Sequence, residues 1–224
     1  KHDMIDVWNH GNGWHLQSLD FSKGFTDIHP MDISWDDKTG HHITTQQLGL
    51  AMGEIAKIFG HPVDIYGSDA CLMAMPEVAY EMQGSVDYFV GSEETEPGEG
   101  WPYQSFLGSW YAKPNASPAE VAKFLGDAYI KSYQGGVHGN QEVTFSVFDM
   151  AKMPGFVKAA TDLSKEIQGL DAAGISTMHS AVNNSQSFAY SDYVDVGDFI
   201  SNVKLNVPKG VASATIETLK TALQ

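Results

Sequence analysis

Short apolar runs alternate with segments of helical periodicity along the first 150 residues. The runs at Met4–Trp8, 63–67 and 88–92 are typical of strands, and each is followed by a polar or glycine-rich stretch. Between the first two, apolar residues recur at steps of four, three and four, which is helical spacing: Leu48, Met52, Ile55 and Phe59. The pattern predicts a helix over 45–59 that Thr44 or Thr45 caps and Gly60 ends.

The remaining segments continue the alternation. We expect helices over 76–82, 118–133, 153–169 and 211–223, of which the second has Ser117 as its cap and Pro118 at its first position. A further strand is expected over 143–148, and a short one at 32–35 within a loop that spans 15–43. Strands that alternate with helices indicate an α/β fold.

Residues that can do chemistry follow the three main strands. His10 and Gly11 come after the first, Asp69, Ala70 and Cys71 after the second, and the acidic loop 93–100 after the third. In an open α/β sheet, the carboxyl ends of the strands line the binding crevice. A cysteine nucleophile needs a partner that is close in space rather than in sequence, so His10 and Cys71 are a candidate pair. From these residues alone, a packed Cys71 and a solvated His10 remain the simpler interpretations.

Composition narrows the classes of partner. The 224 residues carry 13 basic and 28 acidic side chains, a formal net charge of −15, which disfavours nucleic acid and anionic membrane surfaces. A single cysteine excludes an internal disulfide, and no apolar run approaches the roughly 20 residues that a spanning helix needs. All 13 basic residues are lysines, which fits either a biased base composition or a protease that cleaves after arginine.

Four segments in order resemble the clostripain-like cysteine proteases (peptidase family C11, of the caspase-like clan CD). They are IDVWNHGNGW at 5–14, VDIYGSDACLMAM at 63–75, GSEETEPGEGWPY at 91–103 and, more weakly, YVDVGDF at 193–199. The resemblance implies a caspase-like three-layer α/β/α sandwich with a central, mostly parallel sheet in residues 1–150. It also implies that residues 151–224 form a mostly helical extension packed on the same domain.

The resemblance assigns roles to the residues of the first two blocks. Cys71 would be the nucleophile, His10 would protonate the departing amine, and the N–H groups of Gly11 and Cys71 would hold the oxyanion. We also expect the turn at Cys71 to lie near a helix start, where the helix dipole favours a thiolate.

The resemblance further implies a cysteine endopeptidase that cleaves proteins and peptides after Arg or Lys. Asp69 would lie at the base of the S1 pocket, and Glu99 would be a second acid there, at a position where the family pattern leads us to expect Asp. Members of the family are commonly zymogens that cleave themselves after the catalytic histidine. Lys23 is the first candidate for that cleavage, and Lys38 is the second.

The chain starts almost at the histidine strand, so the resemblance predicts a fragment, a trimmed chain or a processed heavy chain that pairs with its own N-terminal light chain. It also predicts a secreted or cell-surface bacterial protein. We expect no firm cofactor requirement, and calcium is the one candidate, with acidic loops at Asp36–Asp37 and Asp192–Asp195.

Two alternatives to a protease stay open at this point. One is a metal-binding module, although the spacing of its candidate ligands fits no standard zinc pattern: His10, His15, His41, His42, Asp36 and Asp37. The other is an acidic surface binding module without catalysis, in which Cys71 is only a packed residue.

Overall fold

A computed structural model describes residues 2–14, 32–36 and 38–224 of the chain. The chain divides into two compact units, residues 1–151 and residues 152–224. The first unit contains a four-stranded sheet and the second contains helices.

The sheet of the first unit is mixed, with three parallel strands. Its order is β1 (Met4–Trp8), β4 (Val63–Asp69), β5 (Val86–Gly91) and β8 (Ser146–Asp149). The first three strands are parallel, whereas β8 runs antiparallel to β5. Parallel neighbours need crossover connections, and the helical segments of the sequence supply them. The predicted α/β class is therefore confirmed.

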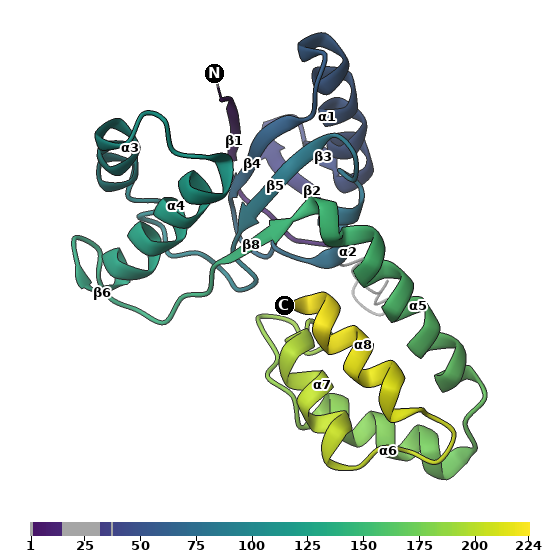
Figure 1. Ribbon diagram of the computed structural model, residues 1–224. Coiled ribbons are helices and arrows are strands. Elements are labelled where there is room, and N and C mark those ends of the chain that lie inside the picture. Colours follow the sequence, from purple (N-terminus) through teal and green to yellow (C-terminus); the bar gives the residue numbers. More distant parts are fainter. Residues whose placement is uncertain (1, 15–31, 37) are drawn as a thin grey trace. The chain divides into compact units, whose positions relative to one another are not determined.

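Helices cover both faces of this sheet (Figure 1). The helices α1 (Thr45–Phe59) and α2 (Pro76–Tyr80) lie on one side, and α3 (Tyr103–Ala112) and α4 (Pro118–Tyr133) lie on the other. A Cβ atom added to Gly49 of α1 would lie 2.4 Å from the carbonyl oxygen of Glu81, just beyond α2, so these two helices are side by side.

The strands bury alternate residues toward the two layers of helices. Ile65 and Val90 belong to a buried cluster with residues of α3 and α4, whereas Tyr66 and Phe89 point to the opposite face and stack on one another. Each large apolar side chain that is fully buried contributes roughly 1.5–3 kcal/mol relative to exposure. Packing on both faces thus fixes the register, because a shift by one residue would exchange the two faces.

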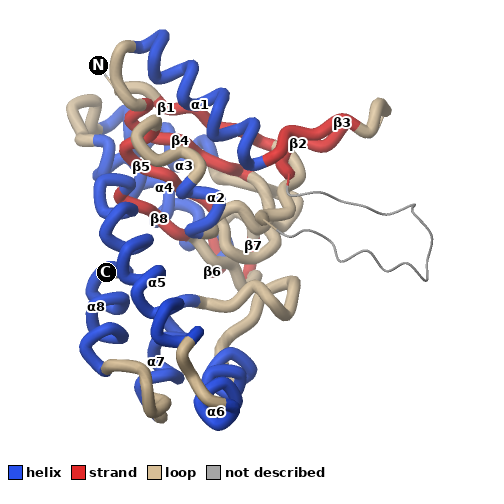
Figure 2. Tube along the Cα trace, turned by 90° about the vertical axis from the view of Figure 1, so that its right-hand side faces the viewer, coloured by secondary structure: helices blue, strands red, loops and turns tan. Residues whose placement is uncertain are grey.

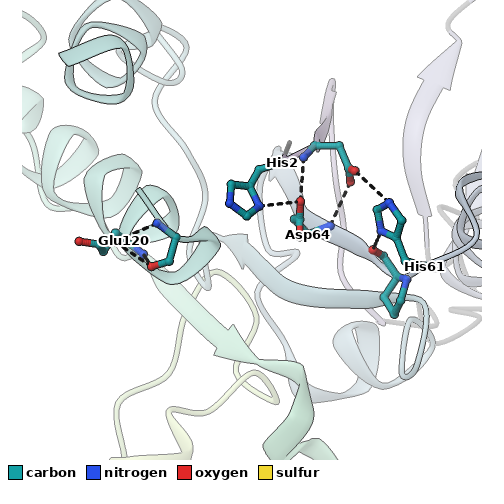
Figure 3. A network of polar contacts seen from close by, with 7 residues as sticks. His2, His61, Asp64 and Glu120 are labelled. Carbon is teal, nitrogen blue, oxygen red and sulfur yellow. Dashed lines mark hydrogen bonds and ion pairs between the residues drawn. The ribbon is translucent and has the colours of Figure 1, made fainter. Parts of the chain in front are cut away.

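Local hydrogen bonds begin the helices and tie down the first strand. Both Thr44 and Ser117 form capping boxes, with Gln47 and Glu120 respectively, and the second of these is visible in Figure 3. The same figure shows the start of β1, where the Asp3 N–H donates to Asp64 (2.9 Å) and the Asp64 N–H donates back to Asp3 (3.1 Å). His2 and His61 lie against these two carboxylates. The network holds the amino end of β1 on β4.

Two small antiparallel pairs complete the first unit. β2 (Asp32–Asp36) pairs with β3 (His41–Thr44), and Figure 2 shows this ribbon at the end of the sheet where α1 begins. β6 (Gln134–Gly136) pairs with β7 (Gly139–Asn140). The strand at 32–35 was predicted, but its partner β3 lies in a stretch that the sequence pattern assigned to a loop.

The second unit consists of four helices around a core of its own. They are α5 (Met153–Gln168), α6 (Ala172–Asn183), α7 (Val196–Leu205) and α8 (Ser213–Leu223). The side chains of Asp171 and Asp195 cap α6 and α7. The apolar core includes Leu163 of α5, Ile200 of α7 and Ile216 of α8. Within the described part of the chain, no helix is both long and apolar enough to cross a membrane.

The differences from the sequence pattern are confined to a few elements. α3, α6 and α7 were not predicted, and the strand expected at 143–148 begins only at Ser146. α3 starts after Pro102 without a side-chain cap and buries Phe106 alone, so it lacks both signals by which a helix is recognised in a sequence.

Candidate active site

The first part of the site is the chain just beyond β1, where His10 and Gly11 lie. The Asn9 N–H donates to the Asp69 carbonyl (3.3 Å), which continues the pairing of β1 with β4. The Ser34 N–H donates to the His10 carbonyl (3.0 Å), and Gly11 pairs with Ile33. The backbone at His10 is therefore held from two sides, while its side chain is exposed.

The backbone of Gly11 packs directly against Cys71. A Cβ atom placed on Gly11 would lie 2.5 Å from the Cys71 carbonyl oxygen and 2.8 Å from Cγ of Met73. No side chain fits at such distances, so glycine is required for this approach. Gly11 and Cys71, which are 60 positions apart in the sequence, thus meet at the carboxyl ends of neighbouring parallel strands.

The loop after β5 holds the thiol of Cys71. The Glu96 N–H donates to Cys71 Sγ (3.2 Å), and the Leu72 N–H donates to the Glu94 carbonyl (3.2 Å). Leu72 has a φ of 62°, an uncommon value for a residue other than glycine, so the turn that presents the cysteine is a strained one.

Burial raises the pKa of the Cys71 thiol, and the ionised forms of Glu96 and Glu94 raise it further. The hydrogen bond from the Glu96 backbone opposes these effects without outweighing them. The expectation of a thiolate stabilised by a helix dipole is therefore wrong. The next helix along the chain, α2, has five residues and starts at Pro76, five positions after Cys71.

Asp69 is a buried acid two residues before the cysteine. It is only 2% exposed, and its Oδ2 accepts hydrogen bonds from the Trp101 N–H (3.3 Å) and from Tyr103 Oη (2.6 Å). The backbone of Gly100 also lies close to this carboxylate. Asp69 thus lies at the end of β4, beneath the loop that holds the thiol.

Two further acids lie beside Asp69, and neither was predicted as a site residue. The carboxyl of Glu96 contacts that of Asp69 and accepts a hydrogen bond from Trp101 Nε1 (3.1 Å). Burial first, then the hydrogen bond with Asp69, and then the Asp69 charge raise the pKa of Glu96 to about 9. Asp6 accepts a hydrogen bond from Tyr103 Oη (2.6 Å), and burial raises its pKa to about 6. The polar break that Asp6 makes in an apolar strand was the one signal in the sequence.

The other predicted site residues lie elsewhere. Glu99 is exposed on the loop after β5, and the acid in contact with Asp69 is Glu96. Lys38 is exposed, in a turn whose backbone N–H donates to Asp36. The first candidate for self-cleavage, Lys23, lies outside the described residues, as do His15 and Asp37 of the alternative metal module.

Metal ligation finds no support in the described part of the chain. Over residues 2–14, 32–36 and 38–224, no group of three or more His, Cys, Asp or Glu side chains is arranged to hold a metal ion.

Comparisons with known proteins identify the family to which this chain is similar. A sequence profile described as the clostripain family matches residues 1–221. No curated protein matches the chain in sequence.

Solved structures of similar fold include a secreted C11 cysteine protease from Bacteroides thetaiotaomicron in complex with an irreversible peptide inhibitor (19% identity, TM-score 0.66). The match covers 99% of this chain and 55% of that one. An inactive zymogen C11 protease from Parabacteroides distasonis is similar over 98% of this chain and 53% of its own (20% identity, TM-score 0.63).

A clostripain from Bacteroides thetaiotaomicron, solved with the peptide inhibitor BTN-VLTK-AOMK, is similar over 85% of this chain and 75% of its own (16% identity, TM-score 0.61). The chain thus spans little more than half the length of the first two relatives. These structures share its fold, a mixed sheet with central parallel strands between layers of helices. Because the family profile covers nearly all of its residues, the chain belongs to the clostripain family.

Proposed function

We propose that the protein is a cysteine endopeptidase that hydrolyses peptide bonds after Lys or Arg, with Cys71 as nucleophile and His10 as proton donor. The observation that carries this proposal is the close approach of Gly11 to Cys71, because it puts the histidine turn beside the only thiol of the chain. Membership of the clostripain family supports the reaction class.

The resemblance to clostripain-like proteases supplies the roles, and the contact between the two strand ends supports them. Cys71 Sγ attacks the scissile carbonyl carbon, and the resulting oxyanion accepts hydrogen bonds from the N–H groups of Gly11 and Cys71. His10 donates a proton to the departing amine. Since burial raises the pKa of the thiol, Cys71 is neutral at rest and needs a base when substrate arrives. His10 is the candidate, because its turn lies against the cysteine turn.

The choice of a basic P1 residue rests on the acids beneath the thiol. Asp69 is buried within two residues of the nucleophile, and it lies with Glu96 and Asp6 in a group of three carboxyls. Neighbouring buried carboxylates repel each other when they are ionised, and a bound guanidinium or ammonium group relieves that repulsion. The inhibitor peptide of the related clostripain, VLTK, also ends in a lysine.

Activation by self-cleavage and secretion belong to the same proposal. One relative was solved as an inactive zymogen and another is a secreted protease. Lys23 follows His10 by 13 positions and is the candidate cleavage site, with Lys38 as the second. Sequencing of the new amino terminus in active enzyme would identify the site, and an active enzyme that is intact at both lysines would exclude the cleavage.

The test of the central proposal is covalent labelling of the full-length protein by a peptidyl chloromethyl ketone with Arg or Lys at P1. We expect modification of Cys71, together with cleavage of Arg- or Lys-amide reporters that is lost in Cys71→Ala and in His10→Ala. A matched reagent with an acidic P1 residue serves as the control. Equal labelling by the two reagents would refute the basic specificity, and full activity of Cys71→Ala would refute the mechanism.

A further inference from the structure

Three carboxyl groups lie together at the carboxyl ends of β1 and β4, beneath the cysteine loop. Asp6 comes from β1, Asp69 ends β4, and Glu96 comes from the loop after β5. Tyr103 Oη lies 2.6 Å from an oxygen of both Asp6 and Asp69. One hydroxyl has one proton to donate, so it cannot donate to both carboxylates at once. The group is therefore short of hydrogen-bond donors.

The shortage is also visible in the individual oxygen atoms. Oδ1 of Asp6 and Oε2 of Glu96 are both buried, and neither has a hydrogen-bond partner within the described residues. Buried polar atoms without partners are rare in folded proteins, and each one calls for a physical explanation. A protonated Glu96 can donate to Asp69, but Oδ1 of Asp6 still lacks a donor, which a ligand rich in N–H groups would supply.

Glu96 joins this acidic group to the reacting sulfur. Its backbone N–H donates to Cys71 Sγ (3.2 Å), while its side chain contacts Asp69. Within the described residues, the exposed Glu99 contacts neither Cys71 Sγ nor Asp69. Glu96 therefore contacts the reacting sulfur through its backbone and the buried Asp69 through its side chain.

We propose that Glu96 is the second acidic residue that selects a basic P1 side chain, and that Glu96 loses its proton to solvent when that side chain binds. The inference rests on the proposed function and assigns to Glu96 a role that the sequence pattern gave to Glu99.

The surroundings of Glu96 explain why a proton is present before substrate binds. The groups that act on its carboxyl from the neighbouring elements are Asp69, Asp6, Trp101, Cys71, Tyr129 and Tyr133. None of them is a cation, and burial together with Asp69 raises the pKa of Glu96 to about 9. Below that pH the resting residue is neutral. A bound guanidinium or ammonium group favours the ionised form, so binding releases one proton.

The test measures KM and kcat of the full-length enzyme on Arg- and Lys-amide reporters. The variants are Glu96→Gln, Glu99→Gln for the competing assignment, and Glu54→Gln as a control on the exposed surface of α1. For Glu96→Gln we expect KM to rise roughly tenfold or more with a smaller change in kcat, since a charged hydrogen-bond acceptor is lost. Glu54→Gln should match the wild type. A KM for Glu96→Gln equal to that of Glu54→Gln, or a larger effect in Glu99→Gln, would overturn the assignment.

A second measurement reports binding of a cation separately from the reaction at the thiol. Benzamidine is an uncleaved amidinium, and its inhibition constant reports binding of a cation without any step at Cys71. In the wild type this constant should fall as the pH rises from about 6 to about 9, and in Glu96→Gln it should stay flat. A flat profile in the wild type would refute the release of a proton.

Alkylation of Cys71 by uncharged iodoacetamide shows whether the variant keeps an intact thiol site. We expect equal rates in the wild type and in Glu96→Gln at neutral pH, because the residue replaced is neutral there. If the wild type cleaves no basic reporter, the proposed function fails and the inference fails with it. If the wild type cleaves them and Glu96→Gln behaves as Glu54→Gln does, only the inference fails.

Discussion

The contact between Gly11 and Cys71 can be tested by adding one methyl group. In Gly11→Ala the new Cβ would lie 2.5 Å from the Cys71 carbonyl oxygen, whereas ordinary contacts begin at 3.4 Å. The obstacle is backbone, which cannot turn away as a flexible side chain would. The two turns must therefore separate by about 0.9 Å before this contact becomes an ordinary one.

The separation has different consequences for stability and for activity. Overpacking of this kind costs about 1–3 kcal/mol, which lowers the melting temperature by roughly 3–10 °C in a chain of this length. A displacement of nearly 1 Å between reacting groups costs on the order of 100-fold in rate. Gly11→Ala should therefore remain folded at 25 °C and lose about 100-fold in kcat/KM on a basic reporter.

The assay compares Gly11→Ala with Gly108→Ala. Gly108 lies in α3, where a Cβ atom meets nothing within 4 Å, so the same substitution there should raise stability by about 0.5–1 kcal/mol. Circular dichroism gives the melting temperatures, and reporter cleavage gives kcat/KM. The reasoning is refuted if Gly11→Ala keeps wild-type kcat/KM, or if its melting temperature equals that of Gly108→Ala.

Three further predictions concern charge and capping. The raised pKa of Asp6 means that the native state holds its proton more tightly than the unfolded state does, so ionisation of Asp6 destabilises the fold as pH rises. Asp6→Asn should therefore stabilise the protein by about 2–3 kcal/mol above pH 6 and by little below about pH 4. Urea unfolding at the two pH values would measure both differences. An equal gain at both pH values would contradict this account. The rate of Cys71 alkylation by iodoacetamide should keep rising above the pH at which an ordinary thiol has ionised, because the pKa of this thiol is raised. Cys71→Ala serves as the blank. A rate that levels off near neutral pH would mean that the thiol is already ionised at rest. Ser117→Ala removes a capping side chain of α4 and should cost about 1 kcal/mol in thermal unfolding, whereas no loss would show that the capping box contributes nothing.

The sequence predicted the elements that local chemistry specifies. The helix over 45–59 has apolar residues on one face, Thr44 as a capping residue and Gly60 in a left-handed conformation at its end, and each of these signals lies within a few residues of the element. The three main strands were found for the same reason, since each is a short apolar run that a turn ends. The places of His10 and Cys71 at strand ends followed directly.

The elements that were missed lack such local signals or carry them in an unusual form. β3 is a run of two histidines and two β-branched residues, and it becomes a strand because β2 pairs with it. α7 begins in an acidic tract that resembled a loop, although Asp195 caps it by accepting from the Asp198 N–H. Pairing and packing decide such segments, because their own preferences are weak.

The site shows the same division. The sequence by itself determined that an acid, Asp69, precedes the cysteine by two residues and that an acidic loop follows the third strand. Only the tertiary structure decided which acid of that loop meets Asp69, because Trp101 and Tyr103 fold back onto β4 and bring Glu96 rather than Glu99 to the buried carboxylate. Alternation along a strand determines the face to which a side chain points, but the path of a loop depends on contacts between residues that are distant in sequence. The pKa values of Asp6, Glu96 and Cys71 depend on burial, and burial exists only in the folded chain.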